Sequence, residues 1–335
     1  MVNLNQLMLY NRTEMRIAII FIVVSFFWSC KSDPVPTVVP KTEIKVPRFD
    51  SNLAFAKVQK QLEFGPRVIG TATHDDCKDW IAQTMSEYGW EVEEQDFMAD
   101  LYTGESLPGT NVIAKLNPNA QPRILLAAHY DTRHIAEKDS DKSRYNDPIP
   151  GADDGASGVA VLMSLAKIIS EHPIEIGIDI VFFDAEDYGN PDEDDPDSWA
   201  IGSVHWAKNV SKNYKPKHAI LLDMVGSKNA RFGFEQYSMA VAPTLVNKIW
   251  KLAQDMGYGN YFVSENSGGV HDDHISVINH AGIPMINIIN KTPQGTFGAY
   301  HHTHQDDISI IDRRTMKAVG QVMLAVIYNT QNGKF

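Results

Sequence analysis

Cysteine and positive charge are both scarce in this sequence. Its 335 residues include two cysteines, Cys30 and Cys77, so at most one disulfide bond could form and the fold must depend on its core. The 30 Lys and Arg residues are outnumbered by 42 Asp and Glu. The net charge of -12 argues against nucleic acid as a partner, because phosphate-binding proteins need a basic surface. No P-loop, G-x-G-x-x-G motif or coiled-coil heptad is present, which leaves nucleotide chemistry with little support.

The N-terminal residues have the pattern of an export signal. Arg12 and Arg16 precede an apolar run at 17–28, which is too short to span a bilayer comfortably and is typical of a signal peptide. Cys30 follows Ser29 at the end of this run, as in bacterial lipoprotein signals, so we expect residues 1–30 to be the signal and Cys30 to be lipidated. An ordinary signal peptide or an uncleaved anchor is the alternative. The prediction is an exported protein, periplasmic or anchored in the outer membrane, that touches the membrane only through this lipid.

The rest of the chain divides into a tether and one domain. Residues 31–49 are rich in Pro, Thr and Val and predict a flexible tether, and residues 50–335 form a single domain. Apolar residues at helical spacing predict helices at 52–64, 74–88, 156–170, 244–256 and 313–328. Strands are predicted at 91–97 and 111–116, at a sheet edge, and at the apolar runs 124–128, 178–183, 219–222 and 285–289. The pattern predicts an α/β fold, a three-layer α/β/α sandwich with a mixed, largely parallel central sheet.

Polar residues follow the ends of the four apolar runs. In open α/β sheets ligands bind at the carboxyl ends of the strands, so we expect these side chains to form one site. Zn²⁺ prefers His nitrogen and carboxylate oxygen, and a catalytic zinc has about three protein ligands. The candidate ligands are His129, Asp154, Glu186 or Asp187, Asp223 and His302. Asp154 read alone could be a helix N-cap, and the neighbouring His301 and His304 leave the histidine assignment open.

Several motifs resemble the zinc aminopeptidase clan, and within it the glutaminyl-peptide cyclotransferases of the animal and bacterial type II kind. The clan motifs are 129–132 (HYDT), 151–158 (GADDGASG), 183–187 (FDAED) and 222–226 (LDMVG); those of the cyclotransferases are 65–70 (GPRVIG), 197–198 with 202–203 (DS, GS), 267–275 (SGGVHDDHI) and 301–303 (HHT). The resemblance implies one zinc per chain, held by Asp154, Asp187 and His302. It also implies Glu186 as general acid/base, with Asp223 and Asp272 as a hydrogen-bonded acidic pair beside the substrate.

The activity implied by this resemblance converts the N-terminal glutamine of peptides and proteins to pyroglutamate, with release of ammonia. Aromatic residues should line the pocket, and the candidates are Trp199, Phe297 and Tyr300. Two positions depart from the animal enzymes. Asp187 stands where they have Glu, and His301 stands where they have Trp, which makes that pocket wall more polar. A monomer is expected.

Two other functions are compatible with the same residues. A two-zinc aminopeptidase would hold one metal with His129, Asp154 and Asp223 and the other with Asp154, Asp187 and His302, and Glu186 would activate a bridging water. A peptidase-like binding module that has lost catalysis is the third hypothesis, but such relatives normally lose metal ligands, and the full set stands here.

Overall fold

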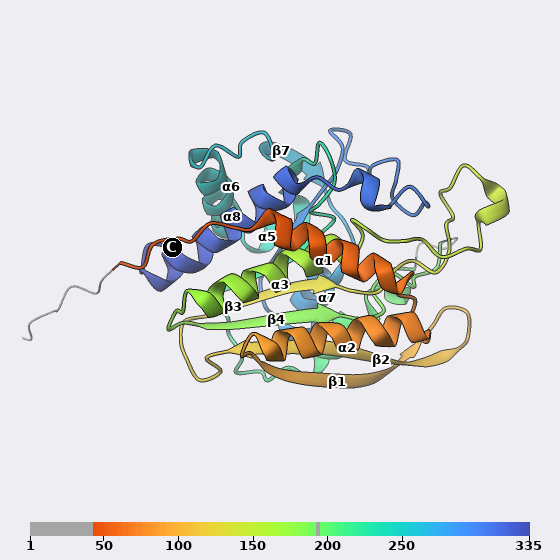
Figure 1. Ribbon diagram of the computed structural model, residues 1–335, viewed down its shortest axis with the longest axis horizontal. Coiled ribbons are helices and arrows are strands. Elements are labelled where there is room, and N and C mark those ends of the chain that lie inside the picture. Colours follow the sequence, from red (N-terminus) through yellow and green to blue (C-terminus); the bar gives the residue numbers. More distant parts are fainter. Residues whose placement is uncertain (1–42, 192–194) are drawn as a thin grey trace, which may run out of the picture. The chain divides into compact units, whose positions relative to one another are not determined.

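The computed structural model describes residues 43–191 and 195–335, so the predicted signal, its Cys30 and most of the predicted tether lie outside the described residues. A six-stranded sheet in the order β1-β2-β4-β3-β5-β8 runs through the domain (Figure 1). Its strands are β1 (Glu91–Asp100), β2 (Ser106–Leu116), β3 (Arg123–His129), β4 (Gly177–Phe183), β5 (His218–Asp223) and β8 (Met285–Ile289). A second, two-stranded sheet pairs β6 (Phe232–Glu235) with β7 (Phe262–Gly268).

The four consecutive strands β4, β3, β5 and β8 are parallel to one another, with β8 at one edge of the sheet, while β1 and β2 are antiparallel additions at the other edge. Every residue of β3, β4 and β8 is buried, because helices cover both faces and the strands can be apolar throughout. The predicted mixed, largely parallel sheet is therefore confirmed, including the two neighbouring strands at its edge.

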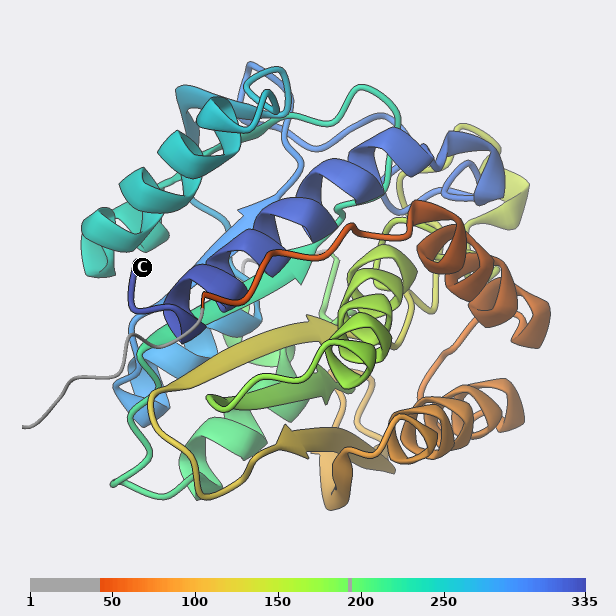
Figure 2. The same ribbon diagram turned by 60° about the vertical axis from the view of Figure 1, so that its left-hand side comes forward.

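Alternate residues of β3 point into two separate cores. Leu126 belongs to the larger core, with residues of α1, α2, α3, α6 and α8, and Leu125 belongs to the smaller one, with residues of α4 and of the turn after α7. Figures 1 and 2 show helices on both sides of the sheet, which confirms the three layers. The helices are α1 (Ser51–Phe64), α2 (Ala72–Glu87), α3 (Ala156–Glu171), α4 (Ile201–Asn209), α5 (Gln236–Val241), α6 (Pro243–Asp255), α7 (Asp273–Ser276) and α8 (Arg313–Gln331).

The last residues of the predicted tether pack against the domain. The backbone N–H of Ile44 donates to Asn332 Oδ1 at 3.0 Å, and that of Phe49 donates to Gln321 Oε1 at 2.9 Å. The Phe49 ring is buried against Gly320 of α8, where a side chain would collide with it. Residues 44–49, predicted as part of the tether, are thus packed on the domain. Within the described residues, no helix has the length and apolar character needed to cross a membrane.

Candidate metal centre and active site

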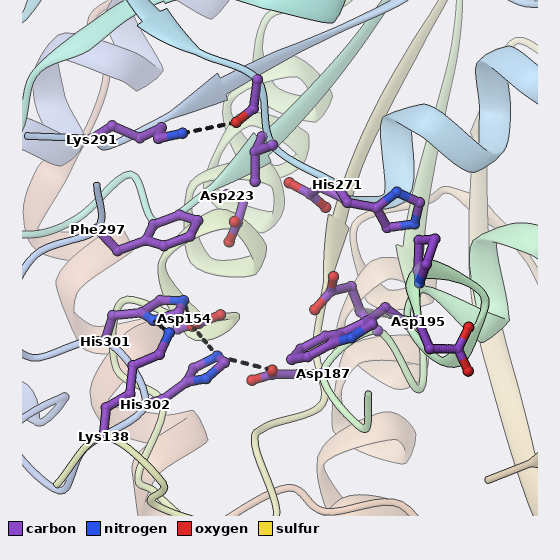
Figure 3. Close-up of a pocket in the computed structure, with 16 residues that line it drawn as sticks. Lys138, Asp154, Asp187, Asp195, Asp223, His271, Lys291, Phe297, His301 and His302 are labelled. Carbon is purple, nitrogen blue, oxygen red and sulfur yellow. Dashed lines mark hydrogen bonds and ion pairs between the residues drawn. The ribbon is translucent and has the colours of Figure 1, made fainter. Parts of the chain in front are cut away.

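A cavity of about 390 Å³ opens at the carboxyl ends of the parallel strands. The segments that follow β3, β4, β5 and β8 all contribute to it, and Asp154, Asp187, Asp223 and His302 line it together (Figure 3). The connections after parallel strands emerge at the same sheet edge, which is why residues far apart in sequence meet here. Glu186, Asp272, Trp199, Phe297 and His301 line the same cavity.

The three residues implied as zinc ligands approach one another through His302. Its Nε2 lies 3.2 Å from Asp187 Oδ1 and 3.8 Å from Asp154 Oδ2. Ligand atoms on a tetrahedral zinc with bonds of about 2.0 Å are separated by about 3.3 Å, so the two distances from His302 suit an ion. Among the described residues, Asp154 and Asp187 do not belong to one group of ligand atoms that all lie within 4.8 Å of one another. Asp187 Oδ2 is buried and has no hydrogen-bond partner, which is costly for a carboxylate that holds no cation. The arrangement fits zinc.

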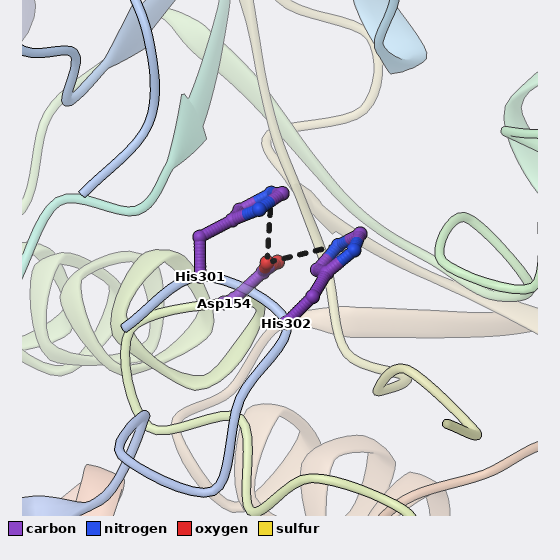
Figure 4. A group of neighbouring side chains, drawn as sticks. All are labelled: Asp154, His301 and His302. Carbon is purple, nitrogen blue, oxygen red and sulfur yellow. Dashed lines mark ion pairs between the residues drawn. The ribbon is translucent and has the colours of Figure 1, made fainter. Parts of the chain in front are cut away.

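His301 also points toward Asp154, with its Nε2 3.7 Å from Asp154 Oδ2 (Figure 4). The ligand atoms of Asp154, His301 and His302 lie within 4.8 Å of one another, so both histidines are close enough to share an ion with this carboxylate. The two histidines differ in their other contacts. Nε2 of His302 also faces Asp187, whereas Nδ1 of His301 accepts a hydrogen bond from Lys138 Nζ at 2.7 Å.

A second group of potential ligands converges on the other oxygen of Asp154. His129 Nε2 lies 3.1 Å from Asp154 Oδ1 and 3.3 Å from Asp223 Oδ1, and the three side chains are buried. Burial opposes protonation of His129, but the nearby carboxylates of Asp131, Asp154 and Asp223 outweigh it and raise the pKa of His129 well above its ordinary value. This shift favours a proton on His129, between Asp154 and Asp223.

Three further carboxylates hold the ligands in place. Glu137 Oε1 accepts a hydrogen bond from His302 Nδ1 at 2.5 Å, which fixes the ring with Nε2 facing the cavity. Asp131 accepts from the backbone N–H groups of Glu186 and Asp187 at 3.1 and 3.0 Å, and Asp306 accepts likewise from Asp153 and Asp154 at 2.7 and 3.1 Å. Sequence analysis did not find Glu137 or Asp306, because both lie in loops without a periodic pattern.

Strained backbone marks three points of the site. Ala185, Met224 and His302 have φ of 51°, 48° and 57°, in the left-handed region that residues with a Cβ seldom adopt. The first precedes Glu186, the second follows Asp223, and the third is itself a candidate ligand. Such strain persists only where the surroundings enforce it, and it is typical of functional sites.

The acidic side of the cavity carries raised pKa values. Burial raises the pKa of Glu186 well above its ordinary value, with the carboxylate of Asp272 adding to the shift and His129 opposing it. Burial likewise raises the pKa of Asp223, again with Asp272 adding to it. Asp272 Oδ2 accepts from Asn287 Nδ2 at 2.5 Å. No hydrogen bond joins Asp223 to Asp272 among the described contacts, so the implied pairing of these two is electrostatic in this structure.

Stacked rings form one wall of the cavity. The ring centroids of Phe297 and His301 are 4.1 Å apart, those of His301 and His302 are 3.7 Å apart, and those of His302 and Trp199 are 6.0 Å apart, all nearly parallel. Tyr300, the remaining aromatic candidate, does not line the cavity. Its hydroxyl donates to Asp153 Oδ2 at 2.5 Å, which holds the ring behind the metal-binding loop.

Comparison with known proteins identifies the family. The model of peptidase family M28 matches residues 111–327. A glutaminyl cyclase of Tannerella forsythia has 45% identity and a TM-score of 0.82 over 84% of this chain and 99% of its own. A Zn-dependent exopeptidase of Parabacteroides distasonis has 44% identity and a TM-score of 0.83 over 85% of this chain and all of its own. Glutaminyl-peptide cyclotransferase of Drosophila melanogaster is 28% identical over 75% of this chain and 73% of its own.

The family match at 111–327 includes every residue that lines the cavity. The matches confirm the resemblance drawn from the motifs and agree with a zinc-dependent site built from buried His and Asp side chains. The chain belongs to peptidase family M28, in the branch that includes the bacterial glutaminyl cyclases.

Proposed function

We propose that the protein is a zinc-dependent glutaminyl-peptide cyclotransferase, which converts the N-terminal glutamine of peptides and proteins to pyroglutamate and ammonia. The observation that carries the proposal is the presence of Asp154, Asp187 and His302 in one cavity with the buried carboxyl of Glu186, in a chain 45% identical to a glutaminyl cyclase. A zinc ion on these three ligands would supply Lewis-acid polarisation of the substrate γ-carbonyl.

The side chains around the ligands supply the remaining chemistry. Asp223 and Asp272 attract the substrate α-amine and hold it near the γ-carbonyl carbon. As the amine nitrogen bonds to that carbon, Glu186 takes its proton and passes it to the γ-amide nitrogen, which leaves as ammonia. The raised pKa of Glu186 suits a group that must both accept and return a proton. Since the attack is intramolecular, no activated water is needed.

We propose one zinc per chain. His129 Nε2 lies 3.1 Å from Asp154 Oδ1 and 3.3 Å from Asp223 Oδ1, and its raised pKa favours a proton where a second ion would bind. The alternative function is the two-zinc aminopeptidase, and the observation that favours it is the convergence of the same three side chains. A metal in place of that proton would give the peptidase its second site.

The two functions differ in product and in metal content. We would incubate the purified protein with a Gln-peptide and with Leu-amide, and measure ammonia, pyroglutamate, free leucine and bound zinc. Ammonia and pyroglutamate without leucine release, at about one zinc per chain, is the expected result. Leucine release without ammonia, at about two zinc ions per chain, would establish the aminopeptidase instead.

We also propose that the protein is exported and anchored through a lipid on Cys30, and that it acts as a monomer on peptide substrates. The pattern of residues 12–30 supports the first point. Expression of a Cys30→Ser variant should move the protein from the membrane fraction to the soluble exported fraction. Retention of that variant in the membrane would argue for an uncleaved anchor.

A further inference from the structure

Two lysines stand beside Phe297 in the wall of the cavity. Nζ of Lys138 lies 5.8 Å from the centre of the Phe297 ring, and Nζ of Lys291 lies 5.4 Å from it. Figure 3 shows both on the same side of the cavity as Phe297. Lys138 Nζ donates a hydrogen bond to Nδ1 of His301. Lys291 donates one described hydrogen bond, to the backbone oxygen of Gly269 at 3.0 Å, so its other N–H groups can serve a ligand.

The positive charge of Lys291 is unusual because the residue is buried. Only 5% of the residue is exposed, and burial lowers its pKa, with Glu235 opposing that shift. An ammonium group withdrawn from water is poorly solvated, so a carboxylate brought against it gains more than it would at the surface. A ligand carboxylate that bonds Lys291 would replace the solvation that its ammonium group has lost.

The location of Lys291 matches the second residue of the substrate. Asp272, which holds the α-amine in the proposed reaction, follows directly on the segment 269–271, and this segment lines the cavity. A substrate held at Asp272 can extend along this segment toward Gly269, whose backbone oxygen accepts a hydrogen bond from Lys291 Nζ at 3.0 Å. Lys291 follows β8 by two residues, so the sheet fixes its position.

We propose that Lys291 selects substrates in which a carboxylate follows the N-terminal glutamine. Either an acidic side chain at the second residue or the terminal carboxylate of a dipeptide presents this group. The inference rests on the proposed cyclotransferase activity and names its substrate class.

The test compares matched substrates by kcat/KM for ammonia release. Gln-Glu-Ala-amide is paired with the neutral Gln-Gln-Ala-amide, and the dipeptide Gln-Ala with Gln-Ala-amide. A charge-assisted hydrogen bond should favour the carboxylate by roughly tenfold to a hundredfold. The pair that shows the preference identifies the source of the carboxylate. Ratios near one in both pairs overturn the proposal, and no variant is needed for that outcome.

Variants then assign the preference to Lys291. Lys291→Gln keeps a donor for Gly269 but removes the charge, and the ratio should fall to about one. Lys291→Arg should retain the preference. Lys251→Gln, at an exposed lysine of α6 that does not line the cavity, changes the net charge equally and should leave all rates unchanged. An undiminished ratio in Lys291→Gln contradicts the proposal, whereas the absence of ammonia from every Gln-peptide contradicts the cyclotransferase function itself.

Discussion

Asp154 is the residue on which both groups of potential ligands depend. One of its oxygens faces His129, and the other faces His301 and His302. Burial opposes ionisation of Asp154, but the hydrogen bond and charge of His129, with the nearby histidines, outweigh it and lower the pKa of Asp154. Glu186, equally buried, has its pKa raised instead. Two carboxyl groups of one cavity are thus prepared for different tasks, the first for binding a cation and the second for transferring a proton.

Glu186→Gln should separate these tasks. The amide has nearly the shape of the carboxyl but cannot exchange the proton, so kcat for ammonia release should fall by roughly 10²- to 10⁴-fold while bound zinc stays unchanged. Steady-state kinetics and metal analysis of the same preparation measure both. Glu87→Gln, at an exposed position at the end of α2, is the matched control and should have wild-type activity. A Glu186→Gln enzyme within a few-fold of wild-type would exclude the assigned role.

The contact between Glu137 and His302 predicts that removal of the Glu137 carboxylate lowers zinc affinity. Its carboxylate bonds Nδ1 of His302 and thereby directs Nε2 to the metal, so Glu137→Ala should weaken zinc binding by roughly tenfold to a hundredfold. Competition with a chelator of known affinity gives the dissociation constant. Asp147→Ala removes an exposed carboxylate ten residues away in the same loop and should not change it. Equal affinities in the two variants would mean that His302 is oriented without Glu137.

At the scale of elements, close contact between helix and strand brings the site together. A Cβ added at Gly158 in α3 would lie 2.2 Å from the backbone oxygen of Leu222 in β5, and one added at Gly202 in α4 would lie 2.2 Å from that of Asp184 after β4. Asp223 comes directly after Leu222, and Glu186 comes two residues after Asp184. The glycines therefore set how near α3 and α4 stand to the strands that carry the functional carboxyl groups.

Gly158→Ala should for this reason destabilise the protein. In an exposed helix interior the change would stabilise by up to about 1 kcal/mol, but here the methyl group collides with backbone, and overpacking costs about 1–3 kcal/mol. Urea denaturation should show a lower midpoint at an unchanged slope. Gly259→Ala, where the added Cβ meets Gln254 at an ordinary 3.5 Å, is the control. A Gly158→Ala protein as stable as wild-type would show that α3 can move without cost.

The elements predicted from the sequence are those whose buried residues form a continuous apolar run or recur at helical spacing. The apolar runs at 178–183 and 285–289 correspond to β4 and β8, and the helical spacing at 313–328 corresponds to α8, because each packs against neighbours throughout. The strand β7 was missed, since FVSENSG exposes its middle residues and pairs with β6 through register shifts. The helix α4 was missed because its apolar face is short and its contacts come from distant segments.

At the scale of the whole molecule, the sequence could predict the residues that act but not those that hold them. Asp154, Asp187 and His302 follow strands or lie in specific motifs, so topology alone gathers them. Glu137 and Asp306 reach the same point from loops, and only the folded backbone shows that one meets His302 and the other the N–H groups of 153 and 154. Hydrogen bonds of this kind have no periodic signature, because each depends on one loop conformation.

The stability of the domain should fall in acid partly because of one buried carboxylate. Glu235 caps α5 through the N–H groups of Tyr237 and Ser238, and lies 3.3 Å from His274. Burial opposes its ionisation, but the nearby His274 and the bonds from the backbone outweigh it and lower the pKa of Glu235 to about 2. A folded-state pKa below the unfolded one means that this stability is present above about pH 4.5 and is lost as the pH falls toward 2.

Glu235→Gln should remove that contribution, which linkage puts at roughly 3 kcal/mol. Wild-type and variant are compared by urea denaturation at pH 7, 4.5 and 3. The difference between them should be large at pH 7 and shrink toward pH 3, because the wild-type carboxylate has by then lost most of its advantage over a neutral group. Glu265→Gln, at an exposed position of β7, should follow the wild-type curve at each pH. A difference that is constant with pH would show that Glu235 acts through packing, since a packing term does not titrate.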